Sequence, residues 1–402
     1  MGSGQSRVNS NPIPLRRVTM IGVPMGYGQD WETGVEKAPG SLRDAGIARV
    51  IEDLGYEFVD AGDIPVQAIA SRRPSEKALS PVTSMPELIE SEVNQIGAAV
   101  VSVKSKSKES EYSEAEIKNS LAIGKALEHL FNRVSSFALN GSFVLNVGGD
   151  HSLGVASLLG MLRAYPSLCV VWVDAHGDCN TPESSLSKNY HGMPAAHALG
   201  WFSRKAPGFG WVDELTKLAE NRLAYIGLRD LDPAEKRLLR QSKVAAYSMS
   251  DVDRLGIAGV MDRVLKGFVE SHELVRQSIG CGTTAPHSTP PLHLTFDIDA
   301  IDPEVAPGTG TRARGGLTYR ESHYICEALA ATGRLVGMDI VEINPELDVN
   351  FDDDSPRGVS SSTAESKHNS LMHGDSSLIN TNLPTVRLGI ELVASALGKT
   401  IL

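Results

Sequence analysis

Residues 170–192 read VVWVDAHGDCNTPESSLSKNYHG, and the rest of the chain can be interpreted outward from them. Four apolar residues predict a short buried strand. Asp174, His176 and Asp178 follow at every second position, and a polar loop then runs to His191. Because alternate side chains of a strand point the same way, we expect these three to converge where the strand leaves the sheet.

Strand-like and helix-like stretches alternate along the whole chain. The strand-like stretches are continuous apolar runs, which is typical of strands buried on both faces. The sequence therefore predicts an α/β protein with a parallel sheet and helices on both faces. The expected strands are 17–23, 58–64, 143–147, 170–173, 223–228, 244–247, 292–298 and 335–341. The expected helices are 39–54, 113–138, 153–164, a short one after 233, 251–269, 318–332 and 383–397.

Three polar stretches interrupt this pattern. They lie near residues 70–114, 275–290 and 351–382 and are rich in Ser, Lys, Glu, Gly or Asp. Such composition cannot bury enough apolar surface to form a core, so we expect surface insertions. The predicted organisation is a flexible leader, 1–16, and a single α/β domain, 17–402.

Composition limits the possible partners and compartment. The chain has 402 residues, of which 41% are hydrophobic, enough for a large core. A net charge of −11 disfavours nucleic acid as a partner. Four cysteines without CxxC spacing fit a reducing, cytoplasmic compartment. The sequence contains no apolar run of 18 residues, so we expect no transmembrane segment.

The first six residues, MGSGQS, fit the pattern for myristoylation of Gly2. One acyl chain gives only weak membrane association. The alternative is an unmodified flexible tail.

Acidic and imidazole side chains follow three of the expected strands. Four carboxylates among them would repel one another at a buried site, and two divalent cations would neutralise their charge. A single histidine could be an ordinary core residue, but the set as a whole predicts a two-metal site. Oxygen-rich ligands without thiolate favour Mn²⁺, with Zn, Co or Fe as alternatives. The candidate ligands are His151, Asp174, His176, Asp178, Asp297 and Asp299.

Two ions about 3.5–4 Å apart can share a water and lower its pKa from about 15.7 to about 7. Such a site would hydrolyse an electrophilic carbon or phosphorus centre, and the ligands alone do not distinguish these.

Six sequence blocks resemble the signature blocks of the arginase/ureohydrolase family, in the same order. The resemblance implies a three-layer sandwich with an approximately eight-stranded, mostly parallel sheet and two Mn²⁺ ions per subunit. It also implies a homotrimer, and the insertion before residue 114 is similar to that of parasite members of the family. The blocks are GVEKAPGSLRDAGI (34–47), GGDHS (148–152), DAHGDCNTP (174–182), FDIDAIDP (296–303), GLTYRE (316–321) and GMDIVEINP (337–345).

The resemblance also assigns the ligands to two ions. One ion would be held by His151, Asp174, Asp178 and Asp297, and the other by Asp174, His176, Asp297 and Asp299. Asp174 and Asp297 would bridge the pair. A hydroxide bridging the ions would attack the guanidinium carbon of L-arginine and release urea and L-ornithine.

The loop after the 170–173 strand resembles that of members that act on L-arginine. By this resemblance, Asn180 and Ser187 would bind the α-carboxylate, while Asp232 and Glu235 would bind the α-amino group. From the residues alone, Asn180 could also form an ordinary turn, and Asp232 a helix N-cap.

The remaining roles concern proton transfer and orientation. The resemblance implies that Asp178 passes a proton to the leaving amine and that His191 is a general acid or shuttle. Glu342 would orient the guanidinium group, and Thr311 would support the pocket. The alternatives are hydrolysis of agmatine or another guanidino compound, or a non-catalytic protein that retains the fold.

Overall fold

The computed structural model describes residues 16–29, 34–71, 111–278, 289–348 and 378–400. The predicted leader, apart from residue 16, and most of the three predicted insertions lie outside the described residues. So does the proposed modification site, Gly2. Among the described residues, no helix is both long enough and apolar enough to cross a membrane.

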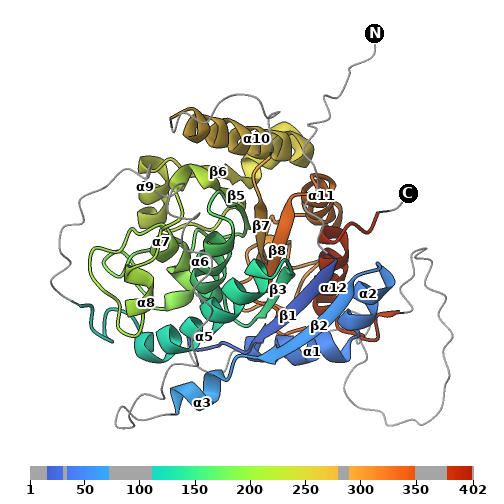
Figure 1. Cartoon of the computed structure of the whole chain (residues 1–402), viewed down its shortest axis with the longest axis horizontal. Coiled ribbons are helices and arrows are strands. Elements are labelled where there is room, and N and C mark those ends of the chain that lie inside the picture. The colour runs from blue at the N-terminus through green and yellow to red at the C-terminus, as the bar shows by residue number, and fades with distance from the viewer. Residues whose placement is uncertain (1–15, 30–33, 72–110, 279–288, 349–377, 401–402) are drawn as a thin grey trace.

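Eight strands form one sheet in the order β2-β1-β3-β8-β7-β4-β5-β6, and every neighbouring pair is parallel. The predicted fold class is therefore confirmed. The last strand in the sequence, β8, lies at the centre of the sheet between β3 and β7 (Figure 1). The strands are β1 (Arg17–Val23), β2 (Glu57–Asp63), β3 (Phe143–Gly148), β4 (Cys169–Val173), β5 (Leu223–Leu228), β6 (Ala245–Ser248), β7 (Leu292–Asp297) and β8 (Leu335–Val341).

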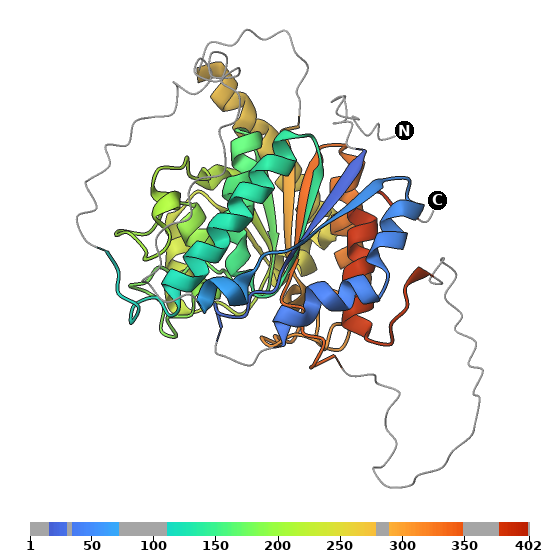
Figure 2. The same cartoon turned by 60° about the horizontal axis from the view of Figure 1, so that its bottom comes forward.

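Helices cover both faces of the sheet, which makes three layers (Figure 2). Buried side chains of α1, α2, α10, α11 and α12 pack in one core, and those of α3, α5, α6 and α7 pack in the other. The helices are α1 (Ala38–Asp44), α2 (Ile47–Asp53), α3 (Val66–Ala70), α5 (Ser120–Leu139), α6 (Gly154–Ala164), α7 (Pro194–Ala198), α8 (Gly210–Asp213), α9 (Pro233–Gln241), α10 (Met249–Ser278), α11 (Tyr319–Ala331) and α12 (Pro384–Ala396).

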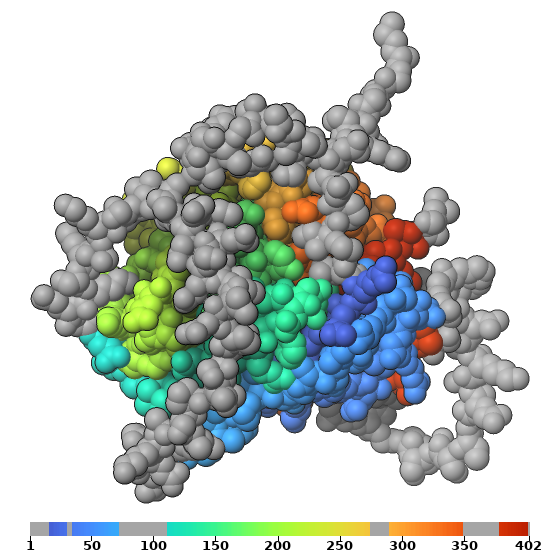
Figure 3. Space-filling view, viewed as in Figure 1, coloured from blue at the N-terminus to red at the C-terminus, as the bar shows by residue number. Residues whose placement is uncertain are grey.

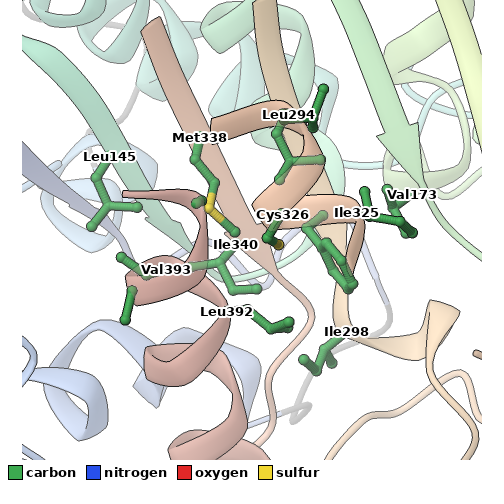
Figure 4. Close-up of a cluster of buried hydrophobic side chains, with 14 of the residues drawn as sticks. Leu145, Val173, Leu294, Ile298, Ile325, Cys326, Met338, Ile340, Leu392 and Val393 are labelled. Atoms are coloured by element: carbon green, nitrogen blue, oxygen red, sulfur yellow. The ribbon is translucent and has the colours of Figure 1, made fainter. Parts of the chain in front are cut away.

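The five central strands are buried along their whole length, whereas the edge strands β2 and β6 are partly exposed. Figure 4 shows the centre of one core, where Leu294 and Met338 from the sheet meet Cys326 of α11 and Val393 of α12. This burial explains why the central strands read as unbroken apolar runs.

Three helices differ by several residues from their predicted bounds. The helix expected over 251–269 is α10, which runs from Met249 to Ser278 and is kinked at Gly256, where φ is 67°. The helix expected over 39–54 is divided into α1 and α2, because Gly46 adopts a φ of 97°, which an α-helix does not allow. The helix expected from residue 113 begins only at Ser120, since Asn119 is left-handed, with a φ of 55°. Residues 113–119 form turns instead.

The N-terminal and C-terminal parts of the described chain lie together at one edge of the molecule. Figure 3 shows the blue N-terminal elements beside red residues of α12. The hydroxyl of Tyr56 donates a hydrogen bond to the carbonyl oxygen of Leu397 over 3.0 Å. This contact lies at the amino-terminal ends of β3 and β8, because Tyr56 and Leu397 line one pocket with Phe143 and Leu335. Ligands bind at the opposite, carboxyl ends of the strands in parallel α/β sheets.

Candidate metal centre

The predicted ligands come together beyond the carboxyl ends of β3, β4 and β7. Ligand atoms within each of two groups lie within 4.8 Å of one another. Asp174 is shared by both groups, so the two lie side by side. The first group is His151, Asp174, Asp178 and Asp297, and the second is Asp174, His176 and Asp299.

The segment after β4 gathers its ligands by a turn. The strand ends at Val173, so side-chain alternation does not extend to the ligands. The backbone N–H of His176 donates to Oδ1 of Asp174 over 2.6 Å, and Asp178 has a left-handed φ of 47°. The expected convergence is therefore present, but it arises from loop conformation.

His151 lies at the centre of the first group. Its Nδ1 is 3.1 Å from Oδ2 of Asp178 and 3.2 Å from carboxylate oxygens of Asp174 and Asp297. Its Nε2 lies 2.9 Å from the hydroxyl of Thr295, and its ring stacks on Trp172 at 4.2 Å. With Nε2 donating to Thr295, the lone pair of Nδ1 faces three carboxylate oxygens. Lone pairs at this distance repel, so a proton or a cation must lie between them.

Other polar groups orient the carboxylates of the centre. The indole N–H of Trp172 donates to Asp174 over 2.8 Å, and the hydroxyl of Thr311 donates to Asp299 over 2.6 Å. The backbone N–H of Asp299 donates to Asp297 over 2.9 Å. Such outer contacts fix ligand geometry and raise the affinity for a metal.

The pKa shifts of His151, Asp178 and Asp297 follow from their burial close to other carboxylates. Burial opposes ionisation of His151, but three carboxylates outweigh it and raise its pKa well above the usual value. Burial and neighbouring carboxylates raise the pKa of Asp297 well above its usual value and that of Asp178 to about 6. Oxygen and imidazole donors that hold protons in this way fit a pair of divalent ions.

Glu342 connects the centre to His191. It follows β8 with a left-handed φ of 62° and is 1% exposed. Its Oε1 accepts from the backbone N–H of His151 over 3.0 Å and lies 3.3 Å from Nδ1 of His191. Gln29 donates to its other oxygen. Burial opposes ionisation of His191, but hydrogen bonding to Glu342 outweighs it and raises the pKa of His191 to about 9.

A polar cluster forms the other side of the site. The amide Nδ2 of Asn180 donates to Asp232 over 2.7 Å. Asp232 also caps α9 in a capping box with Glu235, so the N-cap interpretation is confirmed. Burial, then the charge of Asp178, raises the pKa of Glu235 to about 7.

A pocket of about 280 Å³ joins the two sides. Ser187 is exposed and does not line it, and its hydroxyl accepts from the backbone N–H of Asn189 over 3.2 Å. His151 and Asp174 lie beneath it, fully buried. The pocket is lined by His176, Asp178, Asn180, His191, Gly192, Asp230, Asp232, Glu235, Asp297, Asp299, Thr311 and Glu342.

Four contributors were not predicted from the sequence. Trp172 and Thr295 lie inside apolar strands, where they read as ordinary core residues. Gln29 is distant in the chain from its partner Glu342. Asp230 lines the pocket, with its carboxylate 3.8 Å from Nε2 of His176. Its place at the end of β5, beside Asp232, was the one available signal.

Comparison with known proteins agrees with this fold and site. The sequence pattern of the arginase family matches residues 16–360. An arginase of Plasmodium berghei is 37% identical over 385 residues, which cover 96% of this chain and 93% of that protein. Human arginase-1 is 36% identical over 335 residues, covering 83% of this chain and 86% of that protein.

The structure of an arginase from Bacillus caldovelox superposes with a TM-score of 0.68 at 29% identity. The match covers 96% of this chain and all of that one. The fold and the centre define an α/β protein with a buried His/Asp cluster compatible with a binuclear metal site. The chain belongs to the arginase family.

The contact between Thr295 and His151 predicts a change in metal affinity. In Thr295→Val, Nε2 of His151 loses its partner, so the ring is no longer held with Nδ1 toward the carboxylates. We expect Mn²⁺ affinity to fall about 10–100-fold, measured by calorimetric titration of metal-free protein. Thr309→Val is the control, because its buried hydroxyl has no hydrogen-bond partner among the described residues. Unchanged affinity in Thr295→Val would contradict the orienting role.

The contact between Glu342 and His191 predicts a pH effect. In metal-free Glu342→Gln, we expect the pKa of His191 to fall from about 9 toward the ordinary value near 6.5. Histidine NMR resonances followed against pH measure this change. Because folding raises this pKa, the ionised His191 stabilises the fold below about pH 6.5, and that contribution is lost as pH rises through about 9. A pKa that stayed near 9 would show that other carboxylates cause the shift.

Proposed function

We propose that this protein hydrolyses L-arginine to L-ornithine and urea. Family membership supports the reaction class. The observation that carries the proposal is the pocket, which has the metal-ligand groups on one side and Asn180, Asp232 and Glu235 on the other. A substrate with a cationic guanidinium at one end and an amino acid at the other matches both sides.

The six predicted ligands would hold two Mn²⁺ ions. The family resemblance assigns both Asp174 and Asp297 to the two ions, and of these only Asp174 belongs to both ligand groups in the structure. When bound, the ions would lower the pKa of a shared water and make it a nucleophile at neutral pH. Manganese is favoured because four carboxylates and two imidazoles form a thiolate-free donor set. The carboxylates of Asp174 and Asp299 are already oriented by Trp172 and Thr311.

Glu342 would pair with the guanidinium group and orient its carbon. Its carboxylate lines the pocket and is held at a fixed position by the backbone of His151. Charge complementarity in a buried pocket favours a cationic group here over a neutral one.

Asp178 and His191 would move the protons. Asp178 lines the pocket, where its carboxylate would accept a proton from the nucleophile and pass it on, as the family resemblance implies. His191 lines the same pocket and carries a proton below about pH 9. It can therefore donate to the leaving amine.

The amino-acid end of the substrate would meet the polar cluster. Asn180 would donate to the α-carboxylate, and Asp232 and Glu235 would accept from the α-amino group. Ser187 would complete the carboxylate site from the loop between Asn180 and His191, both of which line the pocket. Agmatine lacks the α-carboxylate, so it would leave Asn180 and Ser187 without their partner.

Urea release tests this proposal directly. Purified protein with Mn²⁺ should hydrolyse L-arginine with a kcat/KM at least about 100-fold above that for agmatine, because a polar site left unpaired costs about 1–3 kcal/mol per group. Asp299→Ala should abolish turnover of both substrates while circular dichroism stays unchanged. A preference for agmatine would reject the proposal.

We further propose a cytoplasmic homotrimer, on the strength of family resemblance and cysteine content. The Gly2 motif supports N-myristoylation in the native cell. Sedimentation velocity would measure the assembly, and intact mass of protein from its own cells would detect the acyl group. A monomer, or an unacylated chain, would reject the respective proposal.

A further inference from the structure

Residues 111–119, here called the brace, pack against the loop 180–191, here called the substrate loop. The brace is the first described segment after residue 71. Figures 1 and 2 both show its cyan trace beside the yellow-green loops around α7 and α8. The brace lines no part of the pocket, yet its hydrogen bonds reach the substrate loop at two points and its flank at a third.

The first contact is made by Tyr112, whose side chain is buried, with 3% of the residue exposed. Its hydroxyl donates to Oε1 of Glu183 in the substrate loop over 2.6 Å. The hydroxyl oxygen of Tyr112 also accepts from the backbone N–H groups of Ser203 and Arg204 over 3.1 and 3.3 Å. The guanidinium of Arg204 covers the ring at 4.1 Å. Tyr112 thus ties one end of the loop to the neighbouring chain.

The second contact lies at the other side of the loop tip. The backbone N–H of Lys118 donates to the carbonyl of Lys188 over 3.0 Å. Lys188 has a left-handed φ of 64°, which is unfavourable for a side chain other than Asn, Asp or Gly. Its amino group donates to the carbonyl of Pro182 over 2.8 Å, closing the loop on itself.

The third contact supports the far end of the loop indirectly. The amide of Asn119 donates to the carbonyl of Tyr27 over 3.0 Å. The next residue, Gly28, accepts at its carbonyl from the backbone N–H of His191 over 3.2 Å. Brace contacts therefore enclose residues 183–191.

Ser187 lies between the first two contacts. The residue is itself exposed, so its position depends on how firmly the ends of the loop are held. Fixing a backbone residue in one conformation costs conformational entropy. If the loop is already ordered before the substrate binds, this entropy cost does not reduce the affinity for the substrate.

We propose that the brace, through the hydroxyl of Tyr112, positions the substrate loop and so sets affinity for the α-carboxylate of the substrate. This inference rests on the proposed function. Tyr112 is a positioning residue, because it acts through Glu183 and touches neither the metal ligands nor the pocket.

Tyr112→Phe tests the proposal, since it removes one oxygen and keeps the ring. We expect KM for L-arginine to rise about three- to tenfold while kcat changes less than twofold, from the loss of a hydrogen bond to a carboxylate. The kcat/KM for agmatine, which has no carboxylate, should not change. Tyr56→Phe is the matched control, because that hydroxyl bonds a carbonyl at the opposite edge and should leave both substrates unaffected.

A double-mutant cycle identifies the contact. Glu183→Ala should raise KM for L-arginine by a similar factor, and the double variant Tyr112→Phe/Glu183→Ala should be no worse than either single one. The proposal would be overturned if the two substitutions raised KM for L-arginine multiplicatively, or if Tyr112→Phe left this KM unchanged. An equal loss of kcat/KM for agmatine would also overturn it.

Hydrogen exchange separates this proposal from the proposed function. Peptides covering residues 183–191 should exchange faster in Tyr112→Phe than in wild type, whatever substrate the enzyme prefers. Unchanged exchange would overturn the brace, whereas a wild-type preference for agmatine would overturn only the assignment of its effect to the α-carboxylate.

Discussion

Four carboxylates lie buried beyond the carboxyl ends of the central strands, and their negative charge requires positive charge nearby. The protein places Nδ1 of His151 within 3.2 Å of three of them, and Nδ1 of His176 at 3.0 Å from the fourth, that of Asp299. The raised pKa values of both imidazoles express the same demand. Divalent ions satisfy it more fully than protons do, because each supplies two charges and accepts several donors at once. Hydrogen bonds from Trp172, Thr295 and Thr311 hold the side chains of the candidate ligands in fixed positions.

The other side of the pocket solves a different problem, which is to hold flexible polar groups ready for a small ligand. Asp232 does so by serving as the N-cap of α9, so that its carboxylate is fixed by the backbone of the helix it begins. Asn180 is fixed in turn by Asp232 and by the hydroxyl of Ser184, which donates to it over 2.7 Å. The carboxylate of Asp232 also lines the pocket, so its role as an N-cap is compatible with the proposed binding of the α-amino group.

The sequence predicted those elements whose own residues show a clear apolar pattern. The bounds of β1, β5 and β8 agree with the predicted strands, because unbroken apolar runs end where burial ends. The division of α1 from α2 at Gly46 was not predicted, since helical periodicity continues through a residue whose backbone leaves the helical region. The candidate ligands could be chosen by residue type and strand end, but the turn that gathers them depends on the conformation of Asp178. Contacts between distant segments, such as Gln29 with Glu342 or Tyr112 with Glu183, leave no pattern in a single sequence.

The position of β8 determines the order in which the site can be assembled. β3 leads to His151 and β7 ends at Asp297, and the two strands are joined only through β8, which is the last of the eight to be synthesised. In the finished sheet β8 is the one strand that joins the set β2-β1-β3 to the set β7-β4-β5-β6. The first group of ligands therefore cannot form during most of translation, and its pairing of non-local strands favours slow folding. If the two ligand groups hold metal ions, the binding free energy would stabilise only chains in which β8 has joined β3 to β7.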